Sequence, residues 1–141
     1  MHEINTVTGD IRISIVDDDS SMREAIKTLI SSIGFSVEEF LSAEDLLTSD
    51  MVDVFDCLIL DVRMPGLDGL ELQRRLVAAN ITVPIVFITA HYSEDQRRIA
   101  MDAGAVAFLR KPFTEQELLD AIDASLAIRN KSIERNDEES V

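Results

Sequence analysis

The chain has 141 residues, of which 46% are hydrophobic and 28% charged, so it can build one folded domain and is not a disordered or fibrous chain. Its formal net charge of −14 argues against direct nucleic-acid binding, because neutralising phosphates needs a basic face, but it is compatible with a bound cation. The amino terminus lacks the apolar core of a signal peptide and no apolar run approaches the roughly 18 residues of a membrane span, so we expect a cytoplasmic protein without membrane contact.

The hydrophobic pattern predicts five strands that alternate with five helices. In chain order these are strand 11–16, helix 21–33, strand 35–40, helix 42–49, strand 57–60, helix 70–79, strand 83–88, helix 93–103, strand 105–109 and helix 114–128. The domain is expected to span residues 11–128, between a flexible amino-terminal segment (residues 1–10) and a polar tail (residues 129–141). Such alternation with short connections is typical of a doubly wound α/β fold with a parallel sheet.

Two helices carry the spacing of a capping box at their start. Ser21 and Glu24 have it at the first helix, although Asp19 is also a suitable cap there. Thr114 and Glu117 repeat the spacing at the last helix.

The chain is organised around residues 56–69, DCLILDVRMPGLDG. Their apolar run fits a strand buried on both faces, in which we interpret Cys57 as a small hydrophobe rather than a reactive thiol. The run ends on Asp61, and the turn residues Pro65 and Gly66 follow before the next helix. An acid at the end of such a strand can be a helix cap, a metal ligand or a nucleophile.

Parallel strands bring their carboxyl ends to one edge of the sheet, where open α/β sheets bind ligands. The residues that we expect at this edge are Asp17, Asp18, Asp61, Thr89 and Lys111. Taken singly, Asp17 or Asp18 is better interpreted as a helix cap, but capping does not explain the whole set. Clustered carboxylates repel unless a cation relieves them, and oxygen ligands without His or Cys favour Mg²⁺. A site of this kind suits phosphoryl transfer, in which an Asp can accept the group.

Four segments together resemble the receiver domain of two-component response regulators. They are IVDDD at 15–19, LILDVRMPGLDG at 58–69, ITA at 88–90 and LRKPF at 109–113. The resemblance covers about residues 11–128, and the sequence is most similar to FixJ-type receivers. It implies a flavodoxin-like sheet of strand order 2-1-3-4-5.

The resemblance also implies a role for each residue at the sheet edge. Asp61 would accept a phosphoryl group from a histidine kinase or a histidine phosphotransfer protein. Asp18 would bind Mg²⁺ directly, with Mn²⁺ as a substitute, and Asp17 would bind it largely through water. The other implied features are metal ligands in the Asp61 carboxylate and the backbone carbonyl of Arg63, phosphoryl-binding groups in Thr89 and Lys111, an aromatic switch at Phe108, and a cis bond between Lys111 and Pro112.

Two positions are expected to tune the lifetime of the phosphoryl group. Arg63 could screen the acyl phosphate from water, whereas His91 could either assist or obstruct hydrolysis. Phe108 lacks the hydroxyl of the more frequent Tyr, so a switch there would depend on ring packing, and an ordinary core aromatic is an equally good interpretation.

Helix 93–103 is weakly apolar, relying on Ile99 and alanines, so we expect it to move most when the site is phosphorylated. The expected output surface is formed by this helix, strand 105–109 and the last helix. Through it the chain would bind a downstream protein, an effector domain missing from this sequence, or a second copy of itself.

Two alternatives compete with the signalling role, in which the only chemistry is self-phosphorylation and self-dephosphorylation. A phosphatase of the haloacid dehalogenase type also forms an aspartyl phosphate, but it needs an Asp where this chain has Arg63. A receiver-like scaffold that works without phosphate would not need the complete set of site residues.

Overall fold

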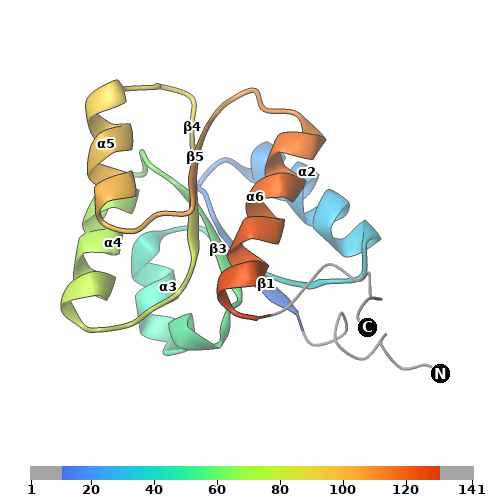
Figure 1. The fold of residues 1–141 in the computed structure, drawn as a ribbon, viewed down its shortest axis with the longest axis horizontal. Helices are drawn as coiled ribbons and strands as arrows, with labels where there is room; N and C mark the ends of the chain where they lie inside the picture. The colour runs from blue at the N-terminus through green and yellow to red at the C-terminus, as the bar shows by residue number, and fades with distance from the viewer. Residues whose placement is uncertain (1–10, 131–141) are drawn as a thin grey trace.

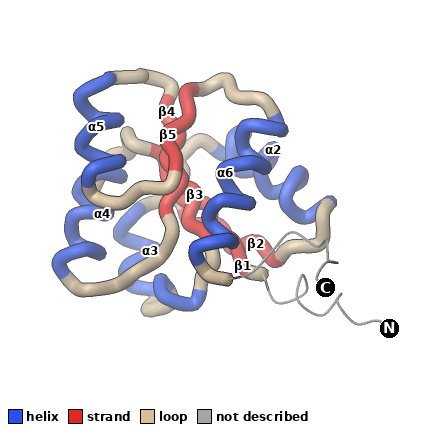
Figure 2. The backbone as a smooth tube through the Cα atoms, in the orientation of Figure 1, coloured by secondary structure: helices blue, strands red, loops and turns tan. Residues whose placement is uncertain are grey.

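The computed structural model describes residues 11–130, which contain a five-stranded parallel sheet (Figures 1 and 2). The strands are β1 Arg12–Val16, β2 Ser36–Phe40, β3 Cys57–Asp61, β4 Ile85–Thr89 and β5 Ala107–Arg110. They lie in the order β2-β1-β3-β4-β5, so the predicted doubly wound fold and its strand order are confirmed. The predicted flexible segment, residues 1–10, and the predicted tail from residue 131 onward lie outside the described residues.

Helices connect the strands and cover both faces of the sheet. Within residues 11–130 they are α2 Ser20–Ser32, α3 Ala43–Ser49, the 3-10 helix η1 Val52–Val54, α4 Gly69–Ala78, α5 Glu94–Asp102 and α6 Glu115–Ile128. The helices α2 and α6 lie on one face, and α3, α4 and α5 lie on the other (Figure 1). None of these helices is long and apolar enough to cross a membrane.

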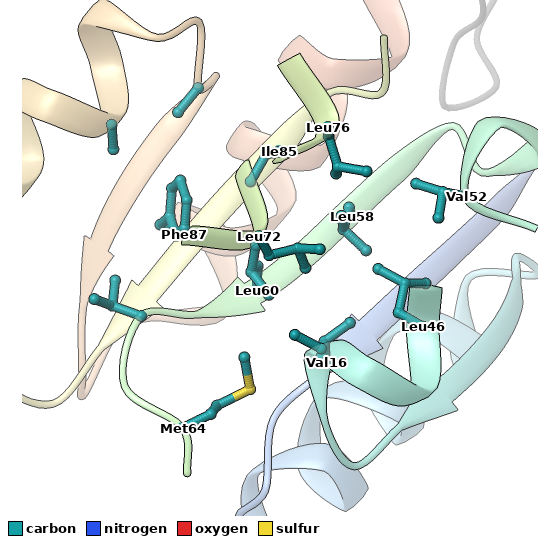
Figure 3. Packing of buried hydrophobic residues seen from close by; sticks show 14 of the residues in the cluster. Val16, Leu46, Val52, Leu58, Leu60, Met64, Leu72, Leu76, Ile85 and Phe87 are labelled. Atoms are coloured by element: carbon teal, nitrogen blue, oxygen red, sulfur yellow. The ribbon is translucent and has the colours of Figure 1, made fainter. Parts of the chain in front are cut away.

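The sheet separates two hydrophobic cores, and β3 contributes to both because all of its residues are buried. Leu58 and Leu60 pack in the same core as Leu72 of α4 (Figure 3), whereas Cys57 and Ile59 belong to the core under α2 and α6. Burying a side chain of leucine size contributes roughly 1.5–3 kcal/mol. Burial also raises the pKa of Cys57 to about 12, which agrees with its interpretation as a small hydrophobe.

The two predicted capping boxes differ in outcome. At α2 the cap is Asp19, whose carboxylate accepts from the backbone N–H of Ser21 at 3.0 Å and of Met22 at 3.3 Å, so the box at Ser21 is wrong. The helix begins at Ser20, directly after its cap Asp19, so Ser21 already lies inside the helix and is not its cap. At α6 both bonds between Thr114 and Glu117 are present, at 2.8 and 3.0 Å, and that box is confirmed.

The face of α5 that packs on the core differs from the predicted one. Ile99 is 57% exposed, whereas Ala100 is fully buried, so the prediction that α5 relies on Ile99 is wrong. The buried Gln73 of α4 donates from Nε2 to the carbonyl oxygen of Ala100 at 3.0 Å and so holds this part of α5. Ala100 is the one fully buried side chain of α5, with partly buried Met101 beside it, so the helix buries little apolar surface and is weakly held.

Several element boundaries also differ from the sequence expectation. β4 begins at Ile85 rather than residue 83, because Pro84 has no N–H to donate to the sheet. β5 begins at residue 107 rather than 105, because the N–H of Ala105 donates to the carbonyl of Ala100 and closes α5. Arg129, the first residue of the predicted tail, follows α6 directly and donates to two backbone carbonyls, of Phe55 and Thr82.

Candidate functional site

Three carboxylates meet at the carboxyl edge of the sheet. Asp61 is the last residue of β3, and Asp17 and Asp18 directly follow the neighbouring strand β1. One carboxylate oxygen from each of the three lies within 4.8 Å of the others. Asp17 is fully buried and Asp61 is 7% exposed, while Asp18 is open to solvent. The predicted acidic cluster is thus present, although its members are far apart in the sequence.

Lys111 supplies the positive charge of this cluster. Its Nζ lies 3.1 Å from Asp17 Oδ2 and 3.5 Å from Asp61 Oδ2, and its side chain is 12% exposed. The longer distance exceeds an ideal hydrogen bond, so its contribution is mainly electrostatic. The backbone holds this lysine in place, because its N–H donates to the carbonyl oxygen of Thr89 at 2.7 Å.

The acidic surroundings change the proton affinity of Asp61. Burial, followed by the negative charge of Asp17, raises the pKa of Asp61 to about 6, although Lys111 acts in the opposite direction. One ammonium therefore does not fully compensate the carboxylates of the cluster. A cation bound between them would relieve the remaining repulsion.

The donor set fits a hard cation. The grouped ligands are carboxylate oxygens from Asp17, Asp18 and Asp61, which could hold a metal ion. Oxygen donors without imidazole or thiolate are typical of Mg²⁺, Mn²⁺ or Ca²⁺ sites rather than zinc or copper sites. The open position of Asp18 gives such an ion access from solvent.

The loop after β3 folds back tightly on Asp61. The N–H of Arg63 donates to Asp61 Oδ1 at 3.3 Å, and the N–H of Gly69 donates to the carbonyl of Val62 at 2.9 Å. A Cβ on Gly69 would lie 2.3 Å from the carbonyl oxygen of Asp61, so only glycine permits this approach. The side chain of Arg63 itself is exposed to solvent. The predicted turn at Pro65 is present within this loop.

Thr89 lies at the same sheet edge, fully buried at the end of β4. Its hydroxyl oxygen accepts from the backbone N–H of His91 at 3.1 Å, while the residue His91 is exposed. The hydroxyl hydrogen of Thr89 is not used in that bond, so it can be donated to another acceptor. The cis bond expected between Lys111 and Pro112 is present.

Phe108 is half-buried on β5 and takes part in a stack of side chains. Its ring lies 5.9 Å from that of Phe87 and 5.9 Å from that of Tyr92, the latter edge to face. The guanidinium of Arg110 lies 4.3 Å from the centre of the Tyr92 ring, and the Tyr92 hydroxyl donates to Glu94 at 2.6 Å. Phe108 therefore lies between the buried ring of Phe87 and the surface stack of Tyr92 on Arg110.

Sequence reasoning missed several residues that support the site. Arg23 donates from Nη1 to the carbonyl oxygen of Asp17 at 2.6 Å, and Glu44 accepts from the N–H of Leu67 at 2.9 Å. Both contacts, like the stack of Tyr92 on Arg110, join residues without any diagnostic spacing. A charged residue in the first turn of a helix is usually interpreted as solvated. No sequence signal therefore marks Arg23 or Glu44 as a residue that supports the site.

Comparisons with known proteins agree on one family. The family model for the response regulator receiver domain matches residues 13–123. Nodulation protein W of Bradyrhizobium diazoefficiens is 50% identical over 113 residues, which are 80% of this chain and 50% of that protein. The transcriptional regulatory protein FixJ of the same organism is 40% identical, over 81% of this chain and 56% of that protein. The chain spans about half the length of these curated relatives.

Solved structures give the same result. The response regulator StyR superposes with a TM-score of 0.78 at 45% identity, over 86% of this chain and 61% of that chain. The structure titled FixJ-N has a TM-score of 0.75 at 33% identity, over 84% of this chain and 94% of that chain.

Proposed function

This chain belongs to the response regulator receiver domain family, and from that premise we propose that Asp61 accepts a phosphoryl group in a reaction that requires Mg²⁺. The donor would be a histidine kinase or a histidine phosphotransfer protein. As a receiver domain the chain has a signalling role, and an Asp-rich site is present. The observation that carries the proposal is the position of Asp61, nearly buried at a strand end, with Lys111 Nζ 3.5 Å from its carboxylate.

For the phosphoryl transfer, the protein mainly has to position the reacting groups and supply charge. A carboxylate oxygen of Asp61 forms the new P–O bond while the P–N bond of the donor phosphohistidine breaks, and the imidazole nitrogen keeps the electron pair. Asp61 must be ionised to attack, and its pKa of about 6 leaves it mostly ionised at neutral pH.

The groups that we propose as holders of the ion are the grouped carboxylates of Asp17, Asp18 and Asp61, together with the backbone carbonyl of Arg63. When bound, Mg²⁺ would neutralise the oxygens of the transferring phosphoryl group. Mn²⁺, which uses similar oxygen donors, would serve as a substitute.

Thr89 and Lys111 are the residues whose side chains would respond to phosphorylation of Asp61. Phosphorylation adds roughly −1.5 to −2 charge at Asp61, and the Lys111 ammonium is within reach of it. The Thr89 hydroxyl would donate its free hydrogen to a phosphoryl oxygen, giving up its contact with the N–H of His91. The loop between β4 and α5 would then move, and the ring of Phe108 would follow it.

The face formed by α5, β5 and α6 is the proposed output surface, for an effector domain, a downstream protein or a second copy of the chain. The side chains of Arg63 and His91 are both exposed near the site, so both can affect how fast water reaches the acyl phosphate. A cytoplasmic location stays a prediction from the sequence.

The rival interpretations are not favoured. A phosphatase of the haloacid dehalogenase type would need an acid at position 63, where the chain has an exposed arginine. A scaffold that works without phosphate gives no reason for Asp17 and Asp61 to be buried against Lys111.

Intact-mass measurement after incubation with acetyl phosphate and Mg²⁺ tests the proposal. The wild-type chain should gain the mass of one phosphoryl group, and the gain should disappear on chelation of Mg²⁺ before the donor is added. Asp61→Asn should gain none. Asp56→Asn is the matched control, because Asp56 is also a buried acid beside β3 but lies at the amino end of that strand. A phosphoryl adduct on Asp61→Asn, or none on the wild type, would reject the assignment.

A further inference from the structure

The loop between β3 and α4, residues 62–68, is held at two separate points. At its base, the N–H of Gly69 donates to the carbonyl of Val62 at 2.9 Å. At its far side, the N–H of Leu67 donates to Oε2 of Glu44 at 2.9 Å, although Glu44 belongs to α3 and lies 23 residues earlier. The loop is therefore tied to another helix as well as to its own strand.

The contact with Glu44 involves the turn itself. Gly66 has a φ of +76°, a conformation that residues with a Cβ rarely adopt. A Cβ on Gly66 would lie 2.7 Å from Oε2 of Glu44, the same oxygen that accepts from Leu67. The turn thus has room for the carboxylate only because its central residue has no side chain.

Glu44 is well placed to make this contact as an ionised group. It lies in the first turn of α3, where unpaired backbone N–H groups favour negative charge. The hydrogen bond from Leu67 lowers the pKa of Glu44. Met64 of the loop is buried in the same core as Ala43 and Leu46 of α3, and partly buried Leu67 packs against that core as well.

We propose that Glu44 is a positioning residue, which holds the loop between β3 and α4 in the shape that lets the Arg63 carbonyl and Asp61 bind a divalent cation together. The proposal rests on the function proposed above for this site. Groups that hold the ligands of a metal commonly change metal affinity without touching the ion. Because the bond from Leu67 is exposed, its loss should loosen the loop locally and leave global stability almost unchanged.

The test compares the 141-residue chain with its variants Glu44→Ala, Glu44→Gln and Asp45→Ala. Asp45 is the matched control, since it is an acid in the same first turn of α3 and its side chain is exposed. Two quantities are measured: the hydrogen exchange rate of the Leu67 amide without metal, and the Mg²⁺ dissociation constant by titration. In Glu44→Ala both should rise, roughly three- to tenfold. Glu44→Gln keeps an acceptor oxygen and should stay within about twofold of the wild type, as should Asp45→Ala.

The outcomes separate the proposal from its alternatives. If Glu44→Gln weakened Mg²⁺ binding as much as Glu44→Ala while the exchange of the Leu67 amide stayed near the wild-type rate, the charge of Glu44 would matter rather than its hydrogen bond, and the positioning role would be overturned. Unchanged Mg²⁺ affinity in Glu44→Ala would overturn it as well. If the wild-type chain bound no Mg²⁺ and accepted no phosphoryl group, the proposed function would fail, whereas Leu67 exchange, measured without metal, would still report on the hydrogen bond.

Discussion

Lys111 lies closer to Asp17 than to Asp61, with Nζ 3.1 Å from Asp17 Oδ2 and 3.5 Å from Asp61 Oδ2. The ammonium is therefore shared between two carboxylates that burial would otherwise force to protonate or to separate. A phosphoryl group on Asp61 would compete with Asp17 for the same ammonium. Under the proposed function, Lys111 would stabilise the buried carboxylates before phosphorylation and would contact the phosphoryl group after it.

Lys111→Met should lower the melting temperature of the metal-free protein, and should lower it less at saturating Mg²⁺. Removing the cation leaves nearly buried carboxylates uncompensated, at a cost of about 1–3 kcal/mol, unless a bound ion restores positive charge. Thermal unfolding with and without Mg²⁺ measures both effects. Lys27→Met is the control, because Lys27 pairs with Glu39 on the surface at 3.0 Å and such pairs contribute about 0–1 kcal/mol. Equal losses in both buffers would contradict the prediction.

Asp61→Asn should stabilise the metal-free protein near pH 7.5 but not near pH 4. The pKa of Asp61 is raised from 3.8 to about 6 in the folded state, so the folded protein holds this proton more tightly than the unfolded chain. Ionised Asp61 therefore costs stability above about pH 6, and the cost disappears as the pH falls from about 6 toward 3.8. At pH 7.5 the gain should be about 1–3 kcal/mol.

Denaturant unfolding of wild type and Asp61→Asn at the two pH values measures this difference, because the other titrating groups are common to both proteins. Saturating Mg²⁺ at pH 7.5 should remove most of the advantage of Asp61→Asn, since only the wild type has its full set of ligands. A stability difference between the two proteins that did not depend on pH would mean that the surroundings of Asp61 do not raise the pKa of its carboxylate.

The fold and the residues at the sheet edge can be predicted from the sequence because both depend on strong, local signals. Apolar runs that end on acids, such as the one before Asp61, place a strand and its last residue together. The topology of a parallel sheet then brings Asp17 and Lys111 to the same edge, although they lie 94 residues apart. Strand order came from the resemblance rather than from the pattern of hydrophobic residues.

What the sequence could not provide are the contacts made by charged and aromatic side chains outside the core. The exposed Ile99 was expected to pack because an isoleucine on a weakly apolar helix is the natural anchor, yet a bond from Gln73 fixes a different face. Tyr92 and Arg110 likewise meet only because the loop before α5 folds over the end of β5. Such contacts depend on tertiary geometry and not on spacing.

Arg110→Ala should loosen the stack over Phe108 without unfolding the domain. The guanidinium lies 4.3 Å from the centre of the Tyr92 ring, and an exposed contact of this kind contributes about 0.5–1 kcal/mol. We expect faster amide hydrogen exchange in the loop at residues 90–93 and in β5, with a melting temperature close to the wild type. Arg98→Ala is the matched control, because Arg98 pairs only with exposed Asp95 on α5 itself. Equal exchange in both variants would show that the stack does not hold the loop.

The hydroxyl of Thr89 should couple phosphorylation of Asp61 to the surface formed by α5 and β5. Acetyl phosphate and Mg²⁺ should change amide exchange in the wild-type chain mainly in α5 and β5, and much less in α2. The reason is the hydroxyl of Thr89, which now accepts from the N–H of His91 at 3.1 Å and would turn to the phosphoryl group on Asp61. That turn removes the bond that shapes the start of the loop to α5.

Substitutions of the phosphoryl acceptor Asp61 and of Thr89 test whether the signal passes through the Thr89 hydroxyl to α5. Thr89→Ser keeps the hydroxyl and should preserve the response, whereas Thr89→Ala should still gain phosphoryl mass but lose the change in α5. The helix can respond because Ala100 is its one fully buried side chain and Gln73 holds it by a single bond to that residue. A response in Asp61→Ala would mean that the donor acts elsewhere on the chain. A full response in Thr89→Ala would mean instead that Lys111, drawn from Asp17 toward the new charge, moves the end of β5 on its own.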